Sequence, residues 1–334
     1  MLPIILCLVT LNLVNCEQQE TTPLPTHQFP CGRIIPAIGM GTYGWGTEMR
    51  AFNSFVSAID NGYRVFDTAS IYDNKMALGL AIRQQIQAKK VIRKDLFVIS
   101  KVWNTFHQRE DVITNIKKDL RDLGLEFLDA GLLHYPTSFL PNSGLMPKYD
   151  NGTFIPMYWD KDRGYLEAYR GLEAAFMLGL IGHIGVSNVN EHQIRKIFDI
   201  AFVRPVILEI ECNPFYRNEK LFQFGLANNM TVFCYAPLRS GKADLEHNQV
   251  LKDIATKHKH SVQQVTLRWN MQRGAVVIPR SHDKNHQLEN LKSLDLALDD
   301  ADMAQINNIT QLPKVMDIKG IQSHPDYPFG KENE

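Results

Sequence analysis

The stretch Arg64-Val65-Phe66-Asp67-Thr68-Ala69 is a short apolar run that ends in polar residues, and a segment of helical period, residues 75–87, follows it. This order of apolar run and helical segment recurs from residue 34 onward. The expected strands are residues 35–42, 64–69, 96–103, 128–136, 181–188, 205–214, 230–238 and 275–281. The expected helices between them include residues 51–61, 75–87, 109–123, 165–178, 191–198, 219–227 and 251–257.

Strands that alternate with helices pair in parallel and have both faces covered. Eight such strands without an intervening linker favour a closed barrel over an open doubly wound sheet. The sequence therefore predicts an α/β fold, a single (β/α)8 TIM-type barrel over residues 34–334, with long loops at its carboxyl face. Residues 137–163, rich in Pro, Gly, Asn and aromatic residues, depart from the alternation and predict a long loop of the kind that sets specificity.

The chain of 334 residues is long enough for a large globular domain that needs no disulfide staples. Lys and Arg together number 36, as do Asp and Glu, so the formal net charge is zero. Such a balance argues against nucleic acid or an anionic membrane as the main partner. A small anionic ligand held by one local cation stays possible.

The first sixteen residues predict a signal peptide, and hence a secreted protein. Residues 3–14 carry no charge and are rich in Leu, Ile and Val, and the chain turns polar at Glu17. The run is too short to span a bilayer, and Val14-Asn15-Cys16 suits signal cleavage. An ordinary buried strand or helix is the alternative. Residues 17–33 form the expected N-terminal segment, with residues 18–27 as a loose mature terminus.

Two further observations bear on secretion. The sequence has three N-glycosylation acceptors, which are Asn151, Asn229 and Asn308. Without the signal, three cysteines without close spacing remain, so no disulfide framework is expected.

Function in a parallel barrel collects at the carboxyl ends of the strands. The residues at these ends, in chain order, are Thr42, Tyr43, Asp67, Lys101, His134, Ser187, Asn188, Glu209, Tyr235, Arg280 and Ser281, with Tyr72 close behind Asp67. Taken singly, Asp67 and Lys101 suit a structural ion pair and His134 a buried core histidine. As an ordered set at successive strand ends, they suit one reaction.

That reaction is the reduction of a carbonyl group, which needs a hydride source and a proton donor. A free tyrosine titrates near pH 10, and a nearby ammonium lowers its pKa by stabilising the phenolate. Lys101 can act on Tyr72 in this way, with Asp67 holding Lys101 in place. His134 can donate to the substrate oxygen and orient it.

Three other motifs are weaker. Gly39-Met40-Gly41-Thr42-Tyr43-Gly44 matches the dinucleotide-binding pattern, but no helix opens after it to receive a pyrophosphate. Ser187 lacks the nucleophile elbow of a hydrolase. His258 and His260, two residues apart, face different ways, so no metal site is expected.

The strand-end motifs resemble the aldo-keto reductase family, over essentially everything from Ile34 to the C-terminus. The matching stretches are GYRVFDTA at 62–69 with Tyr72, SKVWNT at 100–105, LHYP at 133–136, IGVSN at 184–188, IEC at 210–212, YAPL at 235–238, IPRS at 278–281 and DYPF at 326–329. The resemblance implies NADPH-dependent reduction of an aldehyde or ketone to an alcohol, with Tyr72 as general acid, tuned by Lys101 and Asp67, and His134 positioning the carbonyl.

The resemblance also implies the binding residues. Cofactor contacts fall on Thr42, Ser187, Asn188, Glu209, Tyr235, Arg280, Ser281, Glu289 and Asn290, and the substrate walls are Tyr43, Trp103 and Tyr135. Three positions depart from the family pattern. Glu209 replaces the usual Gln, and Leu208 replaces a frequent Asn. His286 replaces an arginine that usually packs near the 2′-phosphate. Arg280 favours NADPH as the cofactor. Because His286 replaces the other arginine, NADH also stays possible.

The expected partner is a small carbonyl substrate, acted on by a monomer. Aromatic walls favour a bulky apolar carbonyl, and the secreted insect 3-dehydroecdysone 3β-reductases resemble this chain in being exported, so a ketosteroid is expected. Two alternatives are a broad-specificity carbonyl scavenger and a catalytically silent extracellular binding barrel, the latter because NADPH is scarce outside cells.

Overall fold

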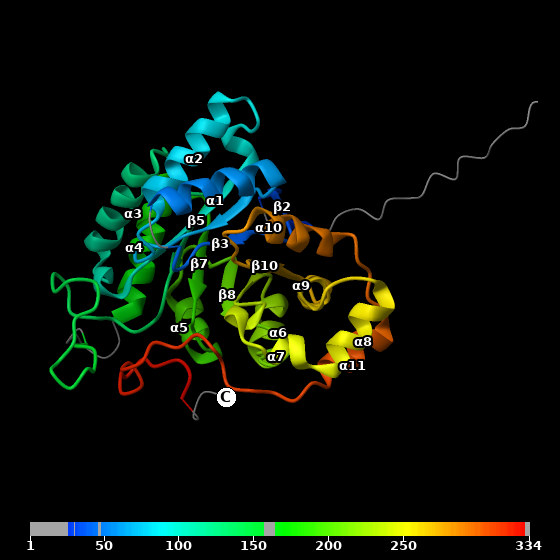
Figure 1. Cartoon of the computed structure of the whole chain (residues 1–334). Helices are drawn as coiled ribbons and strands as arrows, with labels where there is room; N and C mark the ends of the chain where they lie inside the picture. The colour runs from blue at the N-terminus through cyan, green and yellow to red at the C-terminus, as the bar shows by residue number, and fades with distance from the viewer. Residues whose placement is uncertain (1–25, 30, 46–47, 157–163, 331–334) are drawn as a thin grey trace, which may run out of the picture.

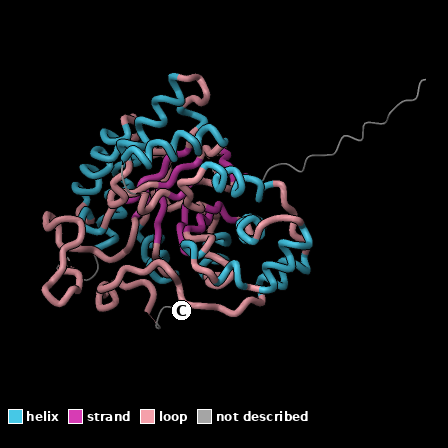
Figure 2. The backbone as a smooth tube through the Cα atoms, in the orientation of Figure 1, coloured by secondary structure: helices cyan, strands magenta, loops and turns pink. Residues whose placement is uncertain are grey.

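The computed structural model describes residues 26–29, 31–45, 48–156 and 164–330, and it confirms the predicted α/β barrel (Figure 1). Strands occupy the centre and helices surround them (Figure 2). The strands of the barrel are β3 (Met40–Gly41), β4 (Val65–Asp67), β5 (Phe97–Val102), β6 (Ala130–Leu133), β7 (Ile184–Ser187), β8 (Ile207–Glu211), β9 (Thr231–Tyr235) and β10 (Ala275–Val277). Neighbours along the chain pair in parallel throughout.

The last strand returns to the first and closes the barrel. Val277 in β10 donates its N–H to the carbonyl of Ala37 at 2.9 Å, and Gly39 donates to the carbonyl of Val277 at 2.8 Å. Gly41 in β3 lies so close to the opposite chain that an added Cβ would sit 2.6 Å from the Ile278 carbonyl oxygen. A larger residue at position 41 would therefore push the closing strands apart.

All seven expected helices are present within a few residues of their expected bounds. They are α1 (Glu48–Asn61), α2 (Lys75–Gln87), α3 (Arg109–Leu123), α4 (Gly164–Met177), α5 (Glu191–Ile200), α6 (Glu219–Ala227) and α8 (Gln249–His258). The structure adds α7 (Asp244–His247), α9 (Val262–Gln272), α10 (Lys284–Leu291) and α11 (Asp300–Asn307), with short 3-10 turns at η1 (Arg93–Asp95), η2 (Asn104–Phe106), η3 (Arg239–Gly241) and η4 (Lys292–Leu294).

The expectation of a loose N-terminal segment up to residue 27 is wrong for residues 26 and 27, which lie in a strand. Strand β1 (Thr26–Gln28) pairs antiparallel with β2 (Ile34–Pro36), so a hairpin precedes the barrel. The cause is Phe29, which is 1% exposed and stacks on Phe97 with 5.3 Å between ring centroids. Burial of this ring orders a polar segment that would otherwise stay loose. The expected signal, residues 1–16, lies outside the described residues.

The strand period of two divides the side chains into an inner and an outer set. In β5, Phe97 and Ile99 join an inner apolar cluster with Phe29 from the hairpin, whereas Val98 and Val102 join the outer core. Lys101 continues the inner series one step further along the strand. The inner cluster therefore fills the lower part of the barrel, and polar residues occupy the next layer up.

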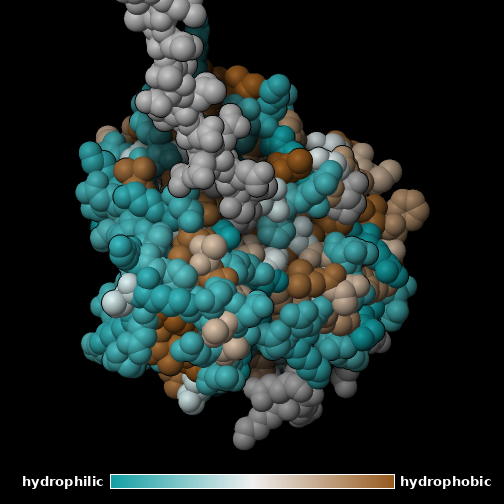
Figure 3. Space-filling view, turned by 90° about the vertical axis from the view of Figure 1, so that its right-hand side faces the viewer, coloured by the Kyte–Doolittle hydropathy of each residue, from teal (hydrophilic) through white to brown (hydrophobic). Residues whose placement is uncertain are grey.

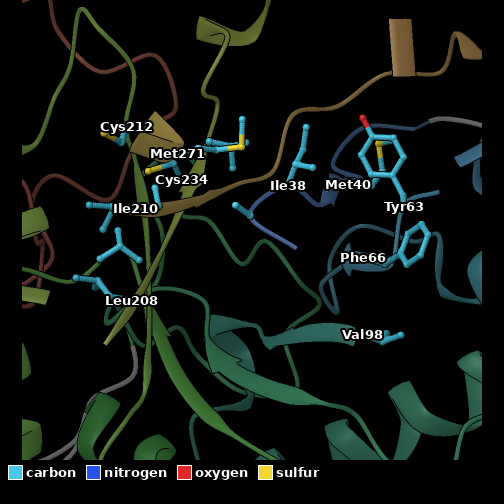
Figure 4. Packing of buried hydrophobic residues seen from close by; sticks show 14 of the residues in the cluster. Ile38, Met40, Tyr63, Phe66, Val98, Leu208, Ile210, Cys212, Cys234 and Met271 are labelled. Carbon is cyan, nitrogen blue, oxygen red and sulfur yellow. The ribbon is translucent and has the colours of Figure 1, made fainter. Parts of the chain in front are cut away.

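The outer core lies between the barrel and its helices. In Figure 4, Cys212, Cys234 and Met271 gather where α9 packs on the strands, and Leu208 belongs to the same core. Hydrophilic residues cover most of the face in Figure 3, with apolar residues in separate patches. Among the described residues, no helix is long and apolar enough to cross a membrane.

Candidate active site

The carboxyl ends of the strands bring the predicted site residues together. Asp67, Ser187 and Tyr235 are the last residues of β4, β7 and β9. Lys101 and Glu209 lie one or two residues before the ends of β5 and β8. Thr42 directly follows β3, and His134 directly follows β6. The parallel arrangement thus collects, at one end of the barrel, side chains that are far apart in the sequence.

Lys101 is the centre of this site. Its ammonium group contacts the Asp67 carboxylate in a short ion pair and lies 3.1 Å from Oε1 of Glu209. All three side chains are almost fully buried. Burial by itself would lower the pKa of Lys101, but the two carboxyl groups outweigh it and raise that pKa. The two carboxyl groups therefore keep Lys101 charged near neutral pH.

Tyr72 lies beside this ammonium. Its ring centroid is 5.1 Å from Nζ of Lys101, and the tyrosine is half-buried. Lys101 acts on the pKa of Tyr72 in the expected direction, but the net pKa lies above its usual value. Lys101 does lower it, but burial raises the pKa of Tyr72 more strongly, and the charges of Asp67 and Glu209 add to the increase. Tyr72 is thus a neutral phenol, ready to act as an acid.

His134 faces Tyr72 and is uncharged near neutral pH. The two ring centroids are 5.6 Å apart in an edge-to-face arrangement. Burial, followed by the charge of Lys101, lowers the pKa of His134 well below its usual range. Its Nδ1 atom is buried and has no hydrogen-bond partner among the described residues. A neutral imidazole beside a phenol can direct the oxygen of a carbonyl compound toward both groups.

Tyr235, Asn188 and Ser187 form a hydrogen-bonded row next to His134. The Tyr235 hydroxyl donates to Oδ1 of Asn188 at 2.5 Å. The Asn188 amide donates to the His134 carbonyl at 2.9 Å and to the Ser187 hydroxyl at 3.0 Å. Asn188 has a φ of 55°, a left-handed conformation that asparagine tolerates better than most residues. This row presents a ring, a hydroxyl and an amide on one side of the site.

The expected phosphate grip lies beyond β10. Arg280 is exposed and donates to the Tyr43 carbonyl at 2.6 Å. The Ser281 hydroxyl accepts from the backbone N–H of Asp283 at 3.1 Å. Asp283 caps α10 by accepting from the backbone N–H of Asn285 and His286 at 2.7 and 3.1 Å. These hydrogen bonds lower the pKa of Asp283, so α10 begins with a carboxylate three residues after Arg280.

The expected adenine contacts lie on α10. Glu289 accepts from the Gln264 side chain through its backbone carbonyl at 2.9 Å, and it is half-buried. Asn290 is buried, and a hydrogen bond with it lowers the pKa of the Tyr63 phenol, although burial raises that pKa more strongly. Asn290 therefore also fixes α10 against the strand that carries Asp67.

These residues fit a nicotinamide dinucleotide. The row of Ser187, Asn188 and Tyr235 offers hydrogen bonds to an amide and an aromatic face to a ring, and Arg280 offers a cation to a phosphate. Bound there, the cofactor would supply a hydride. Glu209, the expected amide contact, instead pairs with Lys101 in this structure.

An aromatic pocket borders the site. Trp103 lies 5.1 Å from the His134 ring and 6.3 Å from the Tyr135 ring, measured between centroids. Its indole N–H donates to the Leu145 carbonyl, at 2.5 Å, and so joins the pocket to the loop of residues 137–156. Tyr43 is 53% exposed and meets the Tyr72 ring edge at 5.3 Å. Trp103 and Tyr135 belong to a buried apolar cluster with Phe139, Phe154 and Ile321.

Two structural supports for Tyr72 do not follow from the sequence motifs. The Asn74 amide donates to the carbonyl and hydroxyl oxygens of Thr42, both at 2.9 Å, and accepts from the Thr68 hydroxyl at 2.6 Å. A buried ion pair between Lys75 and Asp119, at 3.2 Å, lies just after it. Together they hold the loop of residues 68–75 that carries Tyr72. The only sequence signal is a polar Asn-Lys pair at a helix start, which is common on protein surfaces.

The comparisons with known proteins agree with this geometry. A family model described as "Aldo/keto reductase family" matches residues 37–311. The chain is similar to aldo-keto reductase family 1 member A1 of Cricetulus griseus and of Homo sapiens, each 34% identical over 317 residues, covering 89% of this chain and 96% of the relative. The structure of the aldose reductase from Schistosoma japonicum superposes with a TM-score of 0.85 at 30% identity, over 93% of this chain and 99% of that one.

The hydrogen bonds of Asn74 give a first testable prediction. Asn74→Ala leaves the buried carbonyl of Thr42 and the buried hydroxyl of Thr68 without their partner, and each such group costs about 1–3 kcal/mol. We expect a loss of at least about 2 kcal/mol in the free energy of unfolding, measured by urea denaturation. Asn53→Ala, at an exposed position of α1, is the control and should change stability by less than about 0.5 kcal/mol. Equal stabilities of the two variants would refute the role of Asn74.

Proposed function

Since the chain belongs to the aldo-keto reductase family and is an NADPH-dependent oxidoreductase that reduces carbonyl compounds, we propose that its substrate is a bulky apolar ketone, with Tyr72 as the proton donor. The observation that carries the proposal is the position of Tyr72, between the Lys101 ammonium and the His134 ring, at the edge of an aromatic pocket. A monomer, the state expected from the sequence, is part of this proposal.

The proposed chemistry follows from the charges around Tyr72. Hydride addition to the carbonyl carbon leaves negative charge on the carbonyl oxygen, and the Tyr72 hydroxyl gives that oxygen its proton. The phenolate that remains lies near the Lys101 ammonium, whose field acts strongly because the site is buried. The uncharged His134 ring directs the oxygen toward the tyrosine. Burial thus keeps Tyr72 protonated until the carbonyl oxygen takes the proton.

The aromatic side chains beside the site support a steroid ketone as substrate. Trp103, Tyr135 and Phe139 give aromatic walls, and the loop of residues 137–156 extends one of them. Flat apolar surfaces bind a rigid apolar skeleton well. A ketosteroid such as 3-dehydroecdysone fits this chemistry, and a broad-specificity role on simple aldehydes is the alternative. Comparison of kcat/KM for 3-dehydroecdysone and for a simple aromatic aldehyde distinguishes the two.

The role of Tyr72 has a direct test. We expect Tyr72→Phe to lower kcat at least 10²- to 10⁴-fold, because the general acid is lost, while cofactor binding, measured by quenching of protein fluorescence, persists. Tyr165→Phe is a matched control, since the Tyr165 hydroxyl is buried on α4 and has no partner among the described residues. Turnover that survives in Tyr72→Phe would overturn the mechanism. Absence of NADPH oxidation in the wild type would instead support a silent binding protein.

We further propose that Arg280 gives the preference for NADPH over NADH. Arg280→Met should weaken NADPH binding by about tenfold or more and leave NADH binding nearly unchanged, since a charge-assisted contact to the 2′-phosphate is lost. Asp283→Asn should strengthen NADPH binding, because it removes a negative charge at the start of α10, three residues after Arg280. Dissociation constants from fluorescence titration check both, with the exposed Lys118→Met as control. An equal loss of affinity for both cofactors in Arg280→Met would contradict the assignment.

Finally, we propose that the enzyme enters the secretory pathway and is glycosylated. The apolar run of residues 3–14 supports this, as does the exposure of the three acceptor asparagines, Asn151, Asn229 and Asn308. At Asn151 the side-chain oxygen accepts from the Thr153 hydroxyl at 2.6 Å. Expressed in animal cells, the protein should appear in the medium and gain mobility on treatment with a glycosidase that removes N-linked glycans. An unmodified protein retained inside the cells would refute this proposal.

A further inference from the structure

Two carboxyl groups share a single ammonium group at the top of the barrel. Lys101 Nζ contacts Asp67 on one side and lies 3.1 and 3.5 Å from the two oxygens of Glu209 on the other. The three side chains are between 0% and 4% exposed. Because so little of these side chains reaches solvent, the number of protons in this cluster matters.

The charges of the cluster balance only if one carboxyl group is protonated. Two buried carboxylates on one ammonium would leave a net negative charge in a medium of low polarity, and such charges are strongly disfavoured. The other titratable groups that face Glu209 are Tyr72 and Tyr235, which burial keeps neutral. The neighbours of Glu209 in strand register, Ser187 and Phe233, carry no charge. Hence no further cation among the described residues offsets the second carboxylate.

The geometry makes Asp67 the charged partner, because it makes the short ion pair with Lys101, whereas Glu209 lies 3.1 Å from the ammonium. Burial, followed by the charge of Asp67, raises the pKa of Glu209 to about 8. Burial also raises the pKa of Asp67, and the charge of Lys101 limits that increase.

We propose that Glu209 is a positioning residue that carries a proton beside the Asp67–Lys101 ion pair in the working enzyme and weakens the active site when it ionises. A protonated Glu209 is neutral, as glutamine would be, so Lys101 keeps a net positive influence on Tyr72. Ionised, Glu209 adds a negative charge that opposes the phenolate. The role in turnover rests on the proposed function of Tyr72, whereas the proton on Glu209 does not.

An infrared titration of the cofactor-free protein tests the proton directly. At pH 7 we expect the carbonyl band of a buried, protonated carboxyl group, which disappears as the pH rises through about 8. Glu209→Gln should lack this band. Asp67→Asn should lack the band at pH 7, because Glu209 is then the only carboxyl group paired with Lys101 and ionises more easily. The control Glu211→Gln removes a buried carboxyl group of the same strand, which accepts from the Val315 and Met316 N–H groups, and should keep the band.

Protein stability gives a second measurement that does not depend on turnover. Glu209 binds its proton more tightly in the folded protein than in the unfolded chain, where its pKa is 4.5. The difference in proton affinity stabilises the folded state fully below pH 4.5, and this stabilisation is lost as the pH rises through about 8. The stability of the wild type relative to Glu209→Gln should therefore fall as the pH rises from about 4.5 to about 8, and then level off. A constant difference, or a titrating band that persists in Glu209→Gln, would overturn the proposal.

The rate of carbonyl reduction completes the test. Above pH 8 the wild-type kcat should fall about tenfold per pH unit through this ionisation, and Glu209→Gln should hold its rate to higher pH. If the band behaves as expected but the two pH profiles coincide, Glu209 carries the proton without influencing Tyr72, and the positioning role is wrong. Failure of the proposed role of Tyr72 would be seen in a different experiment, as turnover that persists in Tyr72→Phe.

Discussion

The ammonium group of Lys101 is the constraint on which the site depends. A buried cation is costly unless it is paired, and the pairing of Lys101 fixes Asp67 on the adjacent strand β4 and Glu209 on β8, three strands away in the sheet. Tyr72 lies close enough to that cation to be affected by its charge, and the same charge helps to keep His134 uncharged. Electrostatics at one nitrogen atom thus sets the protonation of the whole group of side chains.

The barrel makes this arrangement possible because it separates apolar and polar layers. Inner positions of β5 run from Phe97 through Ile99 to Lys101, so one strand contributes to both layers. The apolar layer below excludes water from the charged layer above. A shift of one residue in the register of β5 would turn Lys101 outward among the helices, where it could no longer contact Asp67 and Glu209.

Much of this could be predicted from the sequence. The alternation of apolar runs and helical segments predicts all eight strands, and the carboxyl-end rule places Asp67, Lys101, His134 and Tyr235 in one site, as the structure confirms. Three features could not be predicted in this way. The N-terminal hairpin depends on one distant ring contact of Phe29, and the support of Tyr72 by Asn74 depends on partners far apart in the chain. The pairing of Glu209 with Lys101 depends on which way a side chain turns, which spacing does not determine.

The hairpin of β1 and β2 has a consequence for how the enzyme can be handled. Phe29 packs against Phe97 at the amino end of β5, so the chain enters the fold at the opposite end of the barrel from Lys101 and Tyr72. A fusion partner, an affinity tag or a chemical linker placed ahead of residue 26 would therefore emerge on the face away from the pocket. Molecules attached to a solid support through that end would present their substrate entrance to the solution.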